Sequence, residues 1–123
     1  MPNQALLDLI DYLEKTSTDV NRLETEAEAV IEEEGQRAFQ IKLEEKSEIL
    51  AALGEKAWKL TEKVEGSLGD EIARKLEQFS MSASAALRIG SVFFMTALLY
   101  PENHKPGEPN DLEAFIKELK EKV

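Results

Sequence analysis

Apolar residues recur along this chain at alternating intervals of three and four positions, in three separate stretches. This spacing places all members of a stretch on one stripe of an α-helix, so each stretch predicts a long amphipathic helix. We call the three stripes seams, and only Thr16 and Lys46 interrupt them. The first seam contains Leu6, Leu9, Leu13, Thr16, Val20, Leu23, Ala27 and Val30. The second contains Phe39, Leu43, Lys46, Leu50, Leu53, Ala57, Leu60 and Val64. The third contains Ile72, Leu76, Phe79, Ala83, Ala86, Gly90, Phe93, Ala97 and Tyr100.

The phase of this repeat changes at two glycine-containing positions, and both predict turns. The first change lies at Gly35 and the second within residues 66–69. Glycine readily adopts the left-handed conformation that ends many helices. We therefore expect helices over about residues 3–33, 36–65 and 70–100. Two alternatives stay open: the hydroxyl residues 16–18 could divide the first helix, and Gly35 could bend one continuous helix rather than end it.

A short fourth helix is predicted over residues 110–121, after a proline-rich loop that begins at Pro101. Asn110, followed three residues later by Glu113, is typical of a capping box at a helix start. The apolar stripe of this helix is Leu112, Phe115, Ile116 and Leu119. Short turns make successive helices antiparallel. The expected fold is all-α: one domain, residues 1–123, in which an antiparallel bundle of three long helices is closed at one end by a short C-terminal helix.

The charge and residue composition of the chain exclude several classes of function. The formal net charge is −10, from 25 acidic and 15 basic residues, which argues against nucleic acids and anionic membranes as partners. The chain has no cysteine, and its first residues lack the basic and apolar segments of a signal peptide. The longest uncharged run, residues 89–101, is shorter than the roughly 20 residues that span a bilayer. We expect a cytoplasmic protein, and no catalytic residue, metal ligand or cofactor is assigned.

The segment from Ile89 to Tyr100 is apolar on every side of its expected helix, so it must be buried on every side. One explanation is that the C-terminal helix covers its outer face. The other is that a second subunit or a partner protein docks there. The candidate interface residues are Leu87, Phe94, Met95, Leu98 and Leu99. Because no catalytic group stands out, the leading hypothesis is a non-enzymatic helical bundle that acts through protein contacts, most simply as a homodimer.

An acidic run lies in the second half of the first helix. Its members include Glu24, Glu28, Glu32 and Glu33. This acidic patch is interpreted first as a solvated helix face. The alternatives are a docking site for a basic protein, as in an acidic regulator, or carboxylates that hold Mg²⁺ or Ca²⁺, since hard cations prefer oxygen ligands.

A second set of carboxylates gives the alternative function. Residues 44–65 carry Glu44, Glu45, Glu48, Glu62 and Glu65. Their order is similar to the EExxE…ExxD pattern of the all-α nucleoside-triphosphate pyrophosphohydrolases, except that Glu65 stands where the family pattern has Asp. In that family such carboxylates bind magnesium and the phosphates of a nucleotide. The resemblance implies a Mg-dependent hydrolase of a nucleotide or another phosphorylated small molecule.

Two residues on the seams carry specific expectations. Lys46 interrupts the second seam, so its ammonium either reaches water along its own stem or pairs with an acid such as one from the first helix. Gly90 lies on the third seam between Ala83 and Ala97. If a neighbouring helix packs closely on this stripe, Gly90→Leu overpacks the bundle and destabilises it by about 1–3 kcal/mol.

Overall fold

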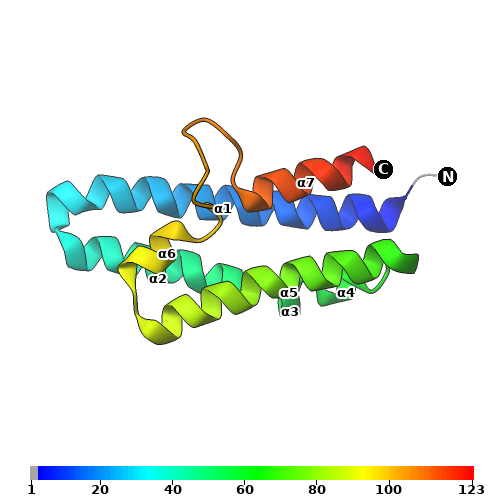
Figure 1. Cartoon of the computed structure of the whole chain (residues 1–123), viewed down its shortest axis with the longest axis horizontal. Helices are drawn as coiled ribbons and strands as arrows, with labels where there is room; N and C mark the ends of the chain where they lie inside the picture. Colours follow the sequence, from blue (N-terminus) through cyan, green and yellow to red (C-terminus); the bar gives the residue numbers. More distant parts are fainter. Residues whose placement is uncertain (1–2) are drawn as a thin grey trace.

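The computed structural model describes residues 3–123 and is all-α within that range, which confirms the expected bundle of long helices plus a short C-terminal helix (Figure 1). The helices are α1 (Gln4–Glu34), α2 (Gln36–Ala51), α3 (Leu53–Lys56), α4 (Trp58–Thr61), α5 (Gly66–Ile89), α6 (Val92–Ala97) and α7 (Asp111–Glu121). Helices α1, α2 and α5 form the long body of the bundle, and α7 lies along the first half of α1 (Figure 1). Within residues 3–123, no helix is both long and apolar enough to cross a membrane. Met1 and Pro2, used above to predict that a signal peptide is lacking, lie outside the described residues.

Helix α1 is continuous, so the alternative of a break at residues 16–18 is wrong. The Thr16 hydroxyl donates to the carbonyl of Tyr12, and the Thr18 hydroxyl donates to that of Glu14. These hydroxyls bond to the carbonyl four residues earlier and leave the helix intact. At the N-terminus, the side chain of Asn3 accepts a hydrogen bond from the backbone N–H of Leu6 and caps the helix.

The turn predicted at Gly35 is confirmed. Gly35 has a φ of 90°, a left-handed backbone angle that glycine adopts without steric cost. Helix α2 then runs back along α1 (Figure 1), and seam residues such as Leu23 of α1 and Leu43 of α2 are buried. The alternative of one bent helix through Gly35 is therefore wrong.

The expected helix over residues 36–65 is regular only as far as Ala51, and the chain continues through the single turns α3 and α4. The first interruption, between α2 and α3, lies where the side chain of Ser80 reaches across from α5. In a regular α-helix the N–H of Gly54 would donate to the carbonyl of Leu50. Here that N–H donates to the Ser80 hydroxyl (3.0 Å), which itself donates to the Leu50 carbonyl (3.0 Å). A side chain inserted into the backbone ladder is a recognised cause of helix irregularity.

The expected helix over residues 70–100 is wrong at both ends. Helix α5 begins earlier, at Gly66, and ends at Ile89. Gly90 has a φ of 70° and its N–H donates to the carbonyls of Ala86 and Leu87, which is a left-handed C-cap. Ser91 then caps α6 by accepting a hydrogen bond from the N–H of Phe94. The Gly-Ser pair therefore ends one helix and starts another.

The change of direction at Gly90 also overturns two details of the third seam. A side-chain Cβ at Gly90 would meet no other atom within 4 Å, so the predicted close helix packing at this position is wrong. In α6 the core-facing residue is Met95, which is 0% exposed, whereas Phe93 on the predicted seam is 75% exposed. Met95 joins Ala27, Leu43 and Ala86 in a small core cluster beneath α6.

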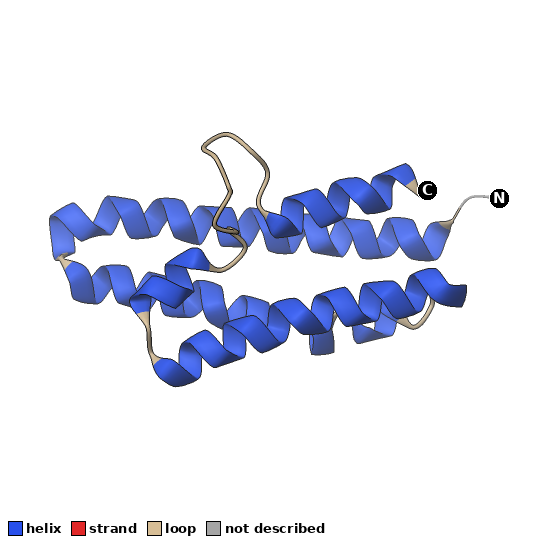
Figure 2. Cartoon of the chain, viewed as in Figure 1, coloured by secondary structure: helices blue, strands red, loops and turns tan. Residues whose placement is uncertain are grey.

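Helix α7 starts with the predicted capping box, in which the side chains of Asn110 and Glu113 each accept a hydrogen bond from the other's backbone N–H. Its apolar stripe is buried, and the Phe115 ring packs edge-on against Phe79 of α5. Because α7 lies along α1, it does not close the end of the bundle as expected. The loop before α7 stands out from the helices (Figure 2). The end of α5 and the outer face of α6 are therefore left without a covering helix.

Candidate functional site

The most unusual polar contact is a buried ion pair between α1 and α2. Lys46 occupies an apolar seam position and is 1% exposed. Its Nζ lies 2.8 Å from Oε2 of Glu24, whose side chain is 21% exposed, and 3.4 Å from the carbonyl oxygen of Thr96 in α6. The prediction that Lys46 pairs with an acid of the first helix is thus confirmed. Burial lowers the pKa of Lys46 below its ordinary value, and the bond to Glu24 opposes that shift.

Tyr100 completes a three-residue network with this pair. Its hydroxyl donates to Oε1 of Glu24 at 2.7 Å, so one carboxylate oxygen of Glu24 accepts from α2 and the other from the loop that follows α6. The Nζ of Lys46 lies 5.3 Å from the centre of the Tyr100 ring, within the range of a cation–π contact. Burial, assisted by the bond to Glu24, raises the pKa of Tyr100 to about 12. The network ties the chain that follows α6 to α1 and α2.

A cavity of about 540 Å³ lies beside this network, between α1, α2 and α6. Its apolar walls include Phe39 and Leu43 from α2 and Phe93 from α6, and its carboxylates are Glu24 and Glu28 from α1. The remaining lining residues are Ala27, Lys46, Thr96, Ala97 and Tyr100. A concave, mainly apolar cavity with a few convergent polar groups is the usual form of a small-molecule site.

The turn between α5 and α6 exposes a group of large apolar side chains. They are Ile89 (65% exposed), Val92 (36%), Phe93 (75%) and Phe94 (49%). The rings of Phe93 and Phe94 pack edge to face with their centres 5.6 Å apart. We call these four residues the apolar corner. It lies at the end of the bundle where α1 turns into α2 (Figure 1).

The predicted interface residues separate into three groups. Phe94 is exposed and belongs to the apolar corner. Leu87 and Leu98 are half-buried. Met95 and Leu99 lie in the core, at 0% and 7% exposed, so a partner cannot reach them while α6 stays in place. The sequence pattern missed Ile89, Val92 and Phe93 as exposed residues because it treated the segment as one continuous helix.

The predicted acidic patch is also divided by the structure. Glu24 is committed to the network with Lys46 and Tyr100, and Glu28 lies on the rim of the cavity. Glu32 and Glu33 are exposed near the C-terminal end of α1. Within residues 3–123, no three histidine, aspartate or glutamate side chains converge closely enough to hold a metal ion.

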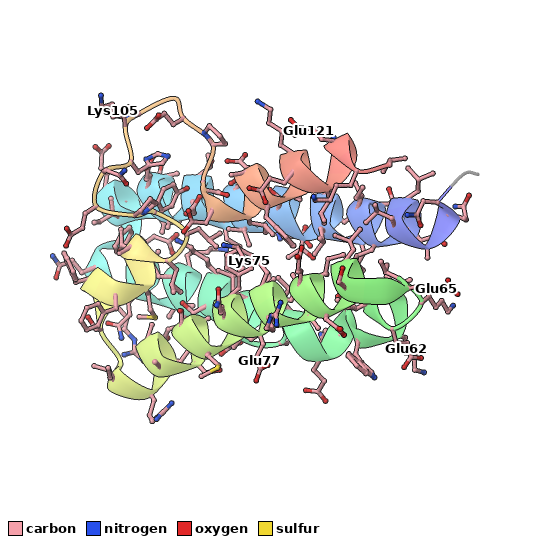
Figure 3. All side chains as sticks on the ribbon, turned by 45° about the vertical axis from the view of Figure 1, so that its right-hand side comes forward. Glu62, Glu65, Lys75, Glu77, Lys105 and Glu121 are labelled. Atoms are coloured by element: carbon pink, nitrogen blue, oxygen red, sulfur yellow. The ribbon has the colours of Figure 1, made fainter. Side chains whose placement is uncertain are left out.

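The carboxylates that resemble the pyrophosphohydrolase pattern are spread over different elements. Glu44, Glu45 and Glu48 belong to α2, whereas Glu62 and Glu65 lie where α4 leads into α5, at the far end of the molecule (Figure 3). They form no metal-binding group among the described residues. The magnesium-dependent hydrolase therefore gains no support from this geometry.

Comparison of the sequence with models of known protein families, with curated proteins and with solved structures found no match.

Proposed function

We propose that this protein is a non-enzymatic helical bundle that acts through protein contacts, and that it self-associates through the apolar corner. The observation that carries the proposal is the exposure of Ile89, Val92, Phe93 and Phe94 together at one turn. The largest exposed apolar patch of a soluble monomer typically covers about 300–600 Å² and is often functional. No helix of residues 3–123 covers this one.

The size of the corner suits a weak dimer. With about 200 Å² for a whole aromatic side chain and somewhat less for Ile or Val, the exposed fractions amount to about 400 Å². A stable interface needs about 800 Å² from each partner. Two corners facing each other would therefore supply about half of a standard interface, and the resulting contact depends on concentration.

Charge supports a second copy of this chain as the partner. The protein carries 25 acidic residues, yet none lies within residues 78–101, where Arg88 is the single charged residue. Two such segments can meet about a two-fold axis without placing carboxylates opposite each other. The acidic remainder of each copy stays in water.

Light scattering over a range of protein concentrations tests the proposal. We expect the mass to rise above the 13.8 kDa of one chain as concentration increases. Phe94→Ser should abolish the rise, because it replaces an exposed ring of the corner. Leu7→Ser is the matched control: Leu7 is also an exposed apolar residue (39%), but it lies in α1 at the opposite end of the bundle. A mass of one chain at all concentrations, or equal effects of the two substitutions, would refute self-association through the corner.

A further inference from the structure

The cavity between α1, α2 and α6 has an unequal supply of hydrogen-bond donors and acceptors. Lys46 donates to Glu24 and to the Thr96 carbonyl, and the Tyr100 hydroxyl donates to Glu24. The Thr96 hydroxyl donates to the carbonyl of Val92. Two of the three Lys46 ammonium hydrogens and the hydroxyl hydrogens of Thr96 and Tyr100 are thus directed at groups of the protein itself.

The acceptors of the cavity are not fully used. Glu28 lies on the rim and is exposed. Among residues 3–123, no cationic side chain lies within ion-pair distance of Glu28. Glu28 follows Glu24 by four residues on α1, so the two carboxylates are neighbours on one helix face, and like charges at this spacing repel. Lys46 neutralises Glu24 but not Glu28, which leaves a net negative charge around the cavity.

The rest of the lining is hydrocarbon. Phe39, Leu43 and Phe93 contribute the largest apolar side chains, and Phe93 is 75% exposed at the mouth. Such walls stabilise an alkyl chain by removing it from water. An aromatic face beside a carboxylate also attracts an organic cation.

From these features we infer that the cavity binds a small amphiphilic amine, an alkylammonium whose chain lies against Phe39, Leu43 and Phe93 and whose charged group meets Glu28. A carboxylate or phosphate would face Glu28, and the one remaining donor, the third hydrogen of the Lys46 ammonium, belongs to a side chain that is only 1% exposed. A neutral hydrocarbon would leave Glu28 without a partner. The inference concerns a free small molecule and does not depend on self-association, although Phe93 belongs both to the cavity wall and to the apolar corner.

Three probes of equal chain length test the charge preference: n-hexylammonium, 1-hexanol and hexanoate. Binding is followed by amide chemical shifts, at a protein concentration low enough for the chain to be monomeric by light scattering. We expect hexylammonium to bind more tightly than hexanol, hexanoate not to bind, and the shifted amides to lie in α1, α2 and α6.

Two pairs of matched variants locate the site. Glu28→Gln should weaken hexylammonium binding by about two- to fivefold, the range of a partly exposed ion pair, whereas Glu32→Gln, one turn further along α1, should not. Phe93→Ser should weaken it through loss of apolar contact, whereas Phe94→Ser should not, because Phe94 does not line this cavity.

Several outcomes would overturn the inference. They are equal affinity for hexylammonium and hexanol, binding of hexanoate, binding that neither Glu28→Gln nor Phe93→Ser changes, and the lack of any shift at millimolar hexylammonium. Loss of self-association in Phe94→Ser with unchanged amine binding would show that amine binding does not require a second copy of the chain.

Discussion

Replacing Glu24 and replacing Lys46 should lower the free energy of unfolding by different amounts, although each substitution removes the same ion pair. Glu24→Gln keeps the shape of the side chain but leaves the Lys46 ammonium, 1% exposed, without its counter-charge. Removing one partner of a buried pair typically costs about 3–5 kcal/mol. The loss also has an upper limit, because Lys46 can give up its proton. From its ordinary pKa of 10.5, deprotonation at neutral pH costs about 5 kcal/mol. We therefore expect Glu24→Gln to lower the free energy of unfolding by about 3–5 kcal/mol.

Lys46→Met should lower the free energy of unfolding by less than Glu24→Gln does. It removes the buried ammonium and leaves Glu24, which keeps its hydrogen bond from Tyr100 and 21% of its side-chain surface in water. A polar group that loses one partner but stays partly hydrated costs about 1–3 kcal/mol. The double variant Glu24→Gln/Lys46→Met should be more stable than the sum of the single losses predicts, because it leaves no buried charge unpaired.

Urea unfolding at neutral pH, followed by far-UV circular dichroism, gives the free energies for wild type, both single variants and the double variant. Glu28→Gln is the control, since this neighbouring acid is exposed and should change stability by less than about 0.5 kcal/mol. Two results would contradict the description of Lys46 and Glu24 as a desolvated ion pair. One is a larger loss of unfolding free energy in Lys46→Met than in Glu24→Gln, and the other is a loss in the double variant equal to the sum of the two single losses.

The remaining predictions concern the same network and the two helix interruptions. The pKa of Tyr100 rises from 10.0 to about 12 on folding. The contribution of the protonated Tyr100 hydroxyl to the free energy of unfolding is therefore complete below pH 10 and is lost as the pH rises toward 12. Wild type should lose more stability across that window than Tyr100→Phe, and equal losses in urea unfolding would contradict the prediction. Gly90→Ala and Gly90→Leu should each lower the free energy of unfolding by about 1–2 kcal/mol, because the φ of 70° at this position is unfavourable for any residue with a Cβ. The two losses should be similar, because a Cβ at Gly90 has open space around it. A much larger loss for Leu in the same assay would indicate crowding. Ser80→Ala should lower the free energy of unfolding by about 1–3 kcal/mol and should speed hydrogen exchange at the Gly54 amide. An unchanged exchange rate would exclude the inserted hydroxyl as the cause of the irregular turn.

The features that could be predicted from the sequence are those encoded locally. The seam of α1 identified its buried face, because a single helix without Gly or Pro keeps one periodicity throughout. The turn at Gly35 and the capping box of Asn110 and Glu113 also depend on neighbouring residues alone. Lys46 was visible as a charge within an apolar seam, which predicted a partner for it.

The features that could not be predicted depend on contacts between distant residues. The interruption directly after α2 involves Ser80, a residue of another helix whose position the local pattern does not contain. Nothing in the spacing distinguishes Glu24 from its acidic neighbours as the partner of Lys46, or brings Tyr100 to the same carboxylate. The end of α5 was different, because the Gly90–Ser91 pair did carry a stop and a start signal. The apolar repeat happened to continue across it and concealed the break.

Self-association through the apolar corner is tested most directly by fluorine NMR of the protein labelled with fluorophenylalanine. The chain contains five phenylalanines: Phe79 and Phe115 are buried, Phe39 lines the cavity, and Phe93 and Phe94 are exposed at the corner. Each resonance can be assigned by a single Phe→Leu substitution. On dilution, we expect the resonances of Phe93 and Phe94 to shift as their rings lose contact with a second copy, while those of Phe79 and Phe115 stay constant. Resonances of Phe93 and Phe94 that do not depend on concentration would contradict it.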